Sequence, residues 1–136
     1  MLREIINDII DKLTDSGVTA VYSAFDAVDI AKKEKGLFTV VGIGGFESFS
    51  PIYSPYTVFI PFKADIEISI TAPPKSSVAE IYSLYDTSIE PVISDMCGLT
   101  CSLSKMSIKF DSNIQRLVLT VRLSASGITR IERSSP

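Results

Sequence analysis

The feature that most constrains the fold is a long run in which apolar and polar side chains alternate. From position 58 to 70 every second residue is apolar: Val58, Ile60, Phe62, Ala64, Ile66, Ile68 and Ile70. Successive side chains of a β-strand point to opposite faces of its sheet, so the run predicts one long strand with a buried face and a solvated face. A second alternating run at 117–125 predicts another strand of this kind. Both exceed the usual strand length of about 5–6 residues.

Helices are predicted from apolar spacing and from capping residues. At about 2–15 apolar residues recur at helical spacing, and Gly17 follows in the position of a left-handed cap. Ser77 and the glutamate three residues later have the spacing of a capping box, which predicts a central helical segment at about 77–97. Pro91 lies inside that segment, so the helix either kinks there or stops and restarts.

Two interruptions of the β pattern are also predicted. Gly42, Gly44 and Gly45 end a β-prone run, and such glycines are typical of a bulge or of a close backbone approach. At Ser104 or Lys105 the alternation slips by one residue, which predicts a second bulge.

The C-terminal region predicts a β-hairpin at about 99–125 that turns at 111–113, followed by a frayed tail at about 132–136. Together the elements predict an α+β fold in a single domain that spans 1–136. We expect a single antiparallel-rich mixed sheet of about 4–5 strands, with the N-terminal and central helices packed on one face.

Composition argues against several classes of function. The chain has 136 residues and a net charge of −3. Tight nucleic-acid binding needs a clustered basic face, whereas the lysines at 32–35 fit the solvated end of a short helix at 26–35. No apolar stretch approaches the about 20 residues of a membrane span, and the N-terminus lacks the pattern of a secretory signal. We therefore expect a cytoplasmic chain that binds neither nucleic acid tightly nor a membrane.

Residues for catalysis and metal binding are scarce. The chain has no histidine, so the commonest general base is missing. Cys97 and Cys101 are four residues apart, which is not the spacing of a redox or zinc motif, and we interpret them as free thiols. The sequence therefore predicts no catalytic residue, no metal site and no cofactor.

Charged residues along the two long strands form the first candidate site. Lys63, Asp65 and Glu67 share the polar face of the first strand, and Arg116 and Arg122 lie on the second. The two carboxylates would hold a hard cation, or act as general acid and base, only if both were sunk in a pocket. A solvated sheet face, or a ladder of opposite charges between subunits, is the interpretation that we favour.

A loop at 47–56 forms the second candidate site. Its two prolines and three serines predict irregular structure. It nevertheless contains four large apolar side chains: Phe49, Ile52, Tyr53 and Tyr56. Such side chains either tuck under the sheet or contact another protein.

The order and lengths of these elements resemble those of the small tail-terminator and tail-completion (minor tail) proteins of tailed phages, prophages and phage-tail-like bacteriocins. The resemblance covers nearly the whole chain and rests on the segments 2–13, 58–70, 77–96 and 117–125. It implies a non-enzymatic subunit that forms a homo-oligomeric ring, commonly hexameric, at the head-proximal end of the tail tube.

The same resemblance implies a tail tube or head-completion protein as partner, and assembly in the cytoplasm into a virion or tail-like particle. We expect the loop at 47–56 and the tail at 128–136 to reach neighbouring subunits or tube proteins. One alternative is a small ligand-binding or enzyme domain, which predicts an enclosed cavity between sheet and helix with Asp65 or Glu67 buried in it. Another is a different phage part, such as a head-completion or baseplate protein.

Overall fold

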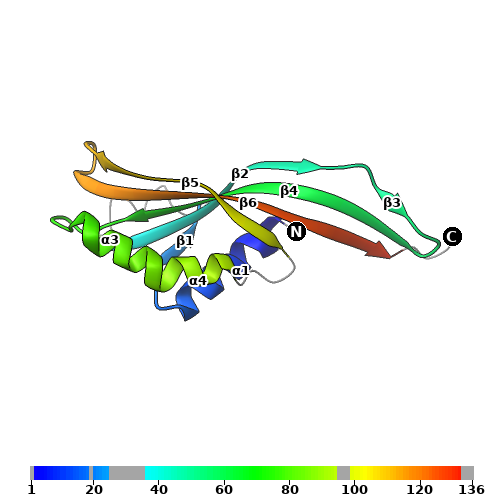
Figure 1. Ribbon diagram of the computed structural model, residues 1–136, viewed down its shortest axis with the longest axis horizontal. Coiled ribbons are helices and arrows are strands. Elements are labelled where there is room, and N and C mark those ends of the chain that lie inside the picture. Colours follow the sequence, from blue (N-terminus) through cyan, green and yellow to red (C-terminus); the bar gives the residue numbers. More distant parts are fainter. Residues whose placement is uncertain (1, 19, 25–35, 95–98, 133–136) are drawn as a thin grey trace.

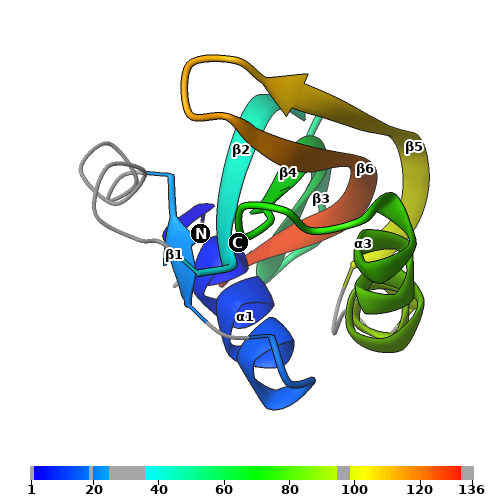
Figure 2. The ribbon, with the colours of Figure 1, turned by 90° about the vertical axis from the view of Figure 1, so that its left-hand side faces the viewer.

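The computed structural model describes residues 2–18, 20–24, 36–94 and 99–132 (Figure 1). Its fold is α+β, as predicted, with helices on one face of a six-stranded mixed sheet (Figure 2). The strands follow the order β1-β2-β4-β6-β5, and β3 pairs with β4 beside them. The short helix expected at 26–35 and Cys97 lie outside the described residues.

The sheet has one strand more than expected. Its members are β1 (Val21–Ser23), β2 (Phe38–Ser48), β3 (Ile52–Tyr53), β4 (Thr57–Thr71), β5 (Thr100–Asp111) and β6 (Arg116–Glu132). The additional strand, β3, lies in the loop for which the sequence predicts irregular structure. The sequence does not reveal it, because two residues are too few to form an alternating pattern. All neighbouring strands pair antiparallel except β1 and β2, which are parallel.

The alternation along β4 is confirmed in its central and C-terminal parts. The side chains that face the helices there are buried: Phe62, Ala64, Ile66, Ile68 and Ile70. Lys63 and Asp65, which point to the other face, are exposed. Both predicted bulges are also present, since the pairing register shifts at Gly44 of β2 and at Ser104 of β5.

The C-terminal hairpin is longer than predicted. Its second strand, β6, continues through Gly127 to Glu132, so the tail expected to fray at 132 begins with a strand residue. Gly127 has no side chain and so interrupts the alternation. Two neighbouring side chains explain why a glycine is needed there. A Cβ there would come within 2.7 Å of side-chain atoms of both Phe62 and Leu99. The pattern is lost at this position because two other side chains fill the space.

Helix α1 (Leu2–Asp15) ends as predicted. Gly17 has a φ of +100°, its N–H donates to the Thr14 carbonyl at 3.1 Å, and the Val18 N–H donates to the Leu13 carbonyl at 3.0 Å. These two hydrogen bonds form a Schellman motif, and the buried side chains of Leu13 and Val18 supply the apolar contact that accompanies it. The motif satisfies carbonyls that the helix end would otherwise leave unpaired.

The central segment begins as predicted and passes Pro91 in a way that the sequence leaves open. Ser77 accepts a hydrogen bond from the Glu80 N–H at 3.2 Å, and α3 (Val78–Leu84) follows. A π-helical turn, η1 (Tyr85–Ile89), then leads into α4 (Glu90–Ser94). Because proline lacks an N–H and its ring crowds the preceding turn, the wider π turn lets the chain remain helical. Residues 95–97 lie outside the described part of the chain.

The helices cover only part of the sheet. In Figure 1, α1, α3 and α4 lie beneath one half, while the other half extends beyond them. We call this extension the arm; it comprises residues 46–62 of β2, β3 and β4 and residues 127–132 of β6. Buried residues of α1 and of the central segment form one core with the covered half of the sheet. The arm therefore has a sheet face that no described helix covers.

Candidate protein-interaction surfaces

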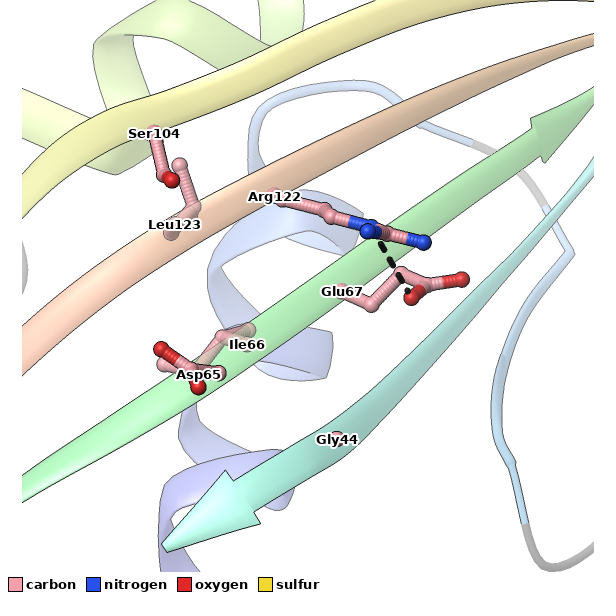
Figure 3. Close-up of a pocket in the computed structure, with 7 residues that line it drawn as sticks. All are labelled: Gly44, Asp65, Ile66, Glu67, Ser104, Arg122 and Leu123. Atoms are coloured by element: carbon pink, nitrogen blue, oxygen red, sulfur yellow. Dashed lines mark ion pairs between the residues drawn. The ribbon is translucent and has the colours of Figure 1, made fainter.

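Four of the five charged candidates lie on the sheet face opposite the helices. Asp65 and Glu67 of β4 and Arg122 of β6 line an open hollow of about 400 Å³ (Figure 3). Glu67 and Arg122 are direct cross-strand partners, and Arg122 Nε lies 3.5 Å from Glu67 Oε2. Lys63 follows on the same face, two residues from Asp65. The cross-strand charge pairing considered from the sequence is therefore present within one chain.

The carboxylates of this face are not enclosed. Asp65 is exposed, and the side chains of Glu67 and Arg122 are 43% and 60% exposed. The buried carboxylate that the ligand-binding or enzyme alternative predicts is therefore wrong for both residues. Among the described residues, no group of three or more acidic or cysteine side chains is placed to hold a metal ion.

Glu67→Gln should change the free energy of unfolding by less than about 1 kcal/mol, because exposed ion pairs contribute little to stability. Urea unfolding at low and high salt measures this. Glu67→Gln is compared with Arg122→Gln, which removes the other partner of the same pair. A loss well above this range would contradict the solvated character of the face.

Arg116 does not belong to this group. It is 8% exposed, its Nη1 donates to the Gly36 carbonyl at 3.2 Å, and its guanidinium lies 5.8 Å from the centre of the Phe38 ring. Its side chain contacts the start of β2 within the chain, so in the single chain it is not an exposed candidate for partner contact as the other four are. The sequence pattern groups Arg116 with Arg122 and gives no sign that its side chain reaches Gly36 and Phe38.

The apolar residues of the 47–56 loop are exposed and do not tuck under the sheet. The exposed fractions are 47% for Phe49, 57% for Ile52, 69% for Tyr53 and 61% for Tyr56. All four lie on the arm, and three further arm residues are exposed as well: Phe46, Ile128 and Ile131. The arm thus carries exposed apolar side chains on both faces of the sheet: Phe46, Tyr53 and Ile131 on the helix face, and Ile52 and Ile128 on the opposite face. Exposed apolar side chains gathered in this way mark contact sites. Phe46 was not among the sequence candidates.

Two titratable side chains with shifted pKa values lie on the helix side of the sheet. Burial raises the pKa of Tyr85, and the charges of Glu90 and Asp86 raise it further. Burial also raises the pKa of the Cys101 thiol, which the charge of Lys12 partly offsets. Both side chains pack in or against the hydrophobic core and are separate from the polar face.

The described helices include none that is long and apolar enough to cross a membrane. No protein-family model matches the sequence, and no curated protein sequence matches it.

Among solved structures, the chain is similar to the sheath/tube terminator of PVC, an extracellular contractile injection system, in its extended state. The TM-score is 0.55 at 9% sequence identity, and the match covers 99% of this chain and 59% of that chain. This chain therefore spans about three-fifths of the terminator's length. At this identity the similarity shows a shared fold.

A weaker similarity is found to PilO, the type 4 fimbrial biogenesis protein of Pseudomonas aeruginosa. The TM-score is 0.32 at 11% identity, with 96% of this chain and 75% of that chain covered. A score this low carries no argument about fold or function.

Proposed function

We propose that this chain is a non-enzymatic structural subunit that ends the tube of a phage tail or of a related contractile particle. In this proposal it forms a homo-oligomeric ring, assembles in the cytoplasm and remains in the finished particle. The observation that carries the proposal is the fold similarity to a sheath/tube terminator over 99% of the chain. The exposed carboxylates and the apolar arm agree with a subunit that acts by contact and not by chemistry.

The two surfaces have different parts in this proposal. The apolar residues of the arm contact a neighbouring subunit or the tube and sheath proteins, because aromatic and aliphatic side chains supply most of the binding energy at interfaces. The charged face around Glu67 and Arg122 remains solvated and sets alignment more than strength. Another phage part, such as a head-completion or baseplate protein, is the runner-up.

Deleting the gene for this chain in a particle-producing host should give tubes of irregular, mostly greater length. A terminator stops tube growth, so its loss removes the stop. Tube lengths measured in negative-stain images test this, with re-expression of the intact chain as the control. Unchanged tube length combined with missing heads would favour head completion, and particles lacking a base would favour the baseplate.

A further inference from the structure

β6 has an open edge along the arm. Its pairing with β5 ends at Ser126, so among the described residues no strand lies beside the outer side of 127–132. Figure 1 shows this segment on one side of the arm, with β2 and β3 on the other. An open edge presents unpaired N–H and C=O groups and is a template for strand addition.

One hydrogen bond fixes which residues face this edge. The Pro61 carbonyl accepts from the Phe49 N–H at 2.9 Å, so Pro61 points its main-chain groups toward β2 and away from β6. Ile128 lies opposite Pro61, and antiparallel partners direct their groups alike, toward each other or away from each other. The main-chain groups of Ile128, and of Arg130 and Glu132 at the same alternation, therefore face the open edge.

β2 has a matching open edge on the opposite side of the sheet. The Ala24 N–H donates to the Val41 carbonyl at 2.9 Å, so Val41 points to the side that β1 occupies. Beyond Val41 no described strand pairs with that side of β2. Because Glu47 pairs with Lys63, whose groups point toward β2 as those of Pro61 do, the groups of Phe46 and Ser48 face outward.

The other outer edges, those of β1, β3 and β5, carry features that oppose pairing. β1 has three residues. β3 has two residues, and Pro51 and Pro55 on either side of it have no N–H to donate. β5 carries two exposed lysines, Lys105 and Lys109. Short strands, prolines and lysines are the devices by which natural sheets block edge pairing. The β6 edge lacks these devices. The β2 edge has no proline or lysine, and beyond its bulge at Gly44 residues 45–48 pair regularly with β4.

We propose that the ring closes because the β6 edge at 127–132 of one copy pairs with the β2 edge at 43–48 of the next copy. The occupant of each edge is thus a second copy of this chain, and the inference rests on the ring in the proposed function. β2 and β6 both run antiparallel to β4, so they are parallel to each other at opposite sides of one sheet. Two unlike edges that face in opposite directions give the head-to-tail contact that a cyclic ring requires.

The side chains beside the two edges are complementary on both faces of the sheet. On the polar face, Glu47 stands beside the β2 edge and Arg130 beside the β6 edge. Arg130 Nε lies 3.2 Å from Glu132 Oε1 within the chain, and pairing would bring Glu47 to the same guanidinium. On the other face, Phe46 is 39% exposed and Ile131 is 48% exposed. In a parallel register with Glu47 opposite Arg130, Ile131 is the diagonal neighbour of Phe46, within reach of an aromatic side chain. Opposite charges and apolar pairs across strands are both stabilising.

Proline substitutions test the two edges separately. Arg130→Pro and Ser48→Pro each remove one outward N–H and no main-chain hydrogen bond within the chain. Arg130→Pro also removes an exposed ion pair with Glu132, which contributes little to stability, so both variants should fold. The intact chain, measured by light scattering after size exclusion at up to about 1 mM, should form a ring of about six copies. Each proline variant should have the mass of one chain, 14.8 kDa. Arg130→Ala and Ser48→Ala keep the N–H and should still form rings.

Mixing the two proline variants gives the most specific result. Each has one blocked edge and one intact edge, so the mixture should form a one-to-one dimer that grows no further. Dimerisation of Ser48→Pro alone would mean that β6 pairs with itself and would overturn the proposal. Rings formed by Arg130→Pro, or an intact chain that stays monomeric throughout, would also overturn it.

Engineered disulfides give the answer even if a proline variant fails to fold. In a background with Cys97→Ser and Cys101→Ser, Glu47→Cys is placed in one preparation and Arg130→Cys in another. Cross-links should form between the two preparations and not within either one, whereas cross-links within one preparation alone would contradict the proposed pairing.

Failure of the pairing and failure of the proposed function are distinguishable. Rings that close through these edges but leave tube length unchanged in the host would keep the pairing and remove the terminator role. Normal tube length in a host that carries only Arg130→Pro would remove the pairing and keep the role.

Discussion

Ile68→Ala is expected to lower the free energy of unfolding by about 2–5 kcal/mol, whereas Ile131→Ala should lower it by less than about 1 kcal/mol. Both isoleucines point to the same face of the sheet. Ile68 is 0% exposed beneath the helices, and Ile131 on the arm is 48% exposed. The same chemical change therefore creates a cavity at one position and removes a half-solvated side chain at the other.

Urea unfolding followed by circular dichroism measures both variants, at a protein concentration low enough to keep the chain monomeric. Ile131→Ala is the matched control, since it removes the same atoms from the same sheet face. A loss at Ile131 as large as that at Ile68 would mean that the arm is covered within a single chain. In that case the apolar residues of the arm would need no partner to explain them.

The sequence predicts the sheet well where the information is local. Alternation marks which face of β4 is apolar. A run of glycines indicates the bulge at Gly44, and a slip in the pattern indicates the bulge at Ser104. Capping chemistry locates the start of α3 at Ser77 and the end of α1 at Gly17. In each case a few adjacent residues decide the conformation, so reading them in order is enough.

The sequence does not predict features that depend on contacts between residues far apart in the chain. β6 continues through Gly127 because Phe62 and Leu99 fill the position, and neither is adjacent to it in the chain. Arg116 is buried where its guanidinium contacts the Gly36 carbonyl and the Phe38 ring, which lie about 80 residues away in the chain. The π turn before Pro91 is one of several ways to accommodate a proline, and the local sequence does not select among them.

The candidate site also combines features that local sequence predicts with features that only distant contacts determine. Alternation predicts that Val58 and Ile60 belong to the apolar face of their strand, and it contains no information about how far the helices extend over that face. Both are only half-buried. Exposure of the loop at 47–56 likewise depends on the arm projecting beyond the helices, which only the assembled fold reveals. A pattern of apolar residues therefore predicts a buried surface, while the structure decides whether the chain itself or a partner buries it.

Replacing Tyr53 and Tyr56 together by serine is expected to weaken binding of the chain to isolated tubes by at least about 30-fold, because an aromatic hot spot typically contributes about 2 kcal/mol or more. Both rings are more than 60% exposed, at 69% and 61%, so the fold should not change. Co-sedimentation with tubes from the deletion strain measures the binding. Deleting residues 50–55 should have the same effect.

Tyr82→Ser is the matched control, since Tyr82 is 48% exposed on α3 and lies outside the arm. It removes a similar exposed ring and should leave tube binding intact. Equal weakening by all three tyrosine changes would indicate a general surface effect. Full binding by the Tyr53 and Tyr56 variant would assign the loop no part in tube contact, and the open edges of β2 and β6 would then be the remaining means by which the arm engages a neighbour.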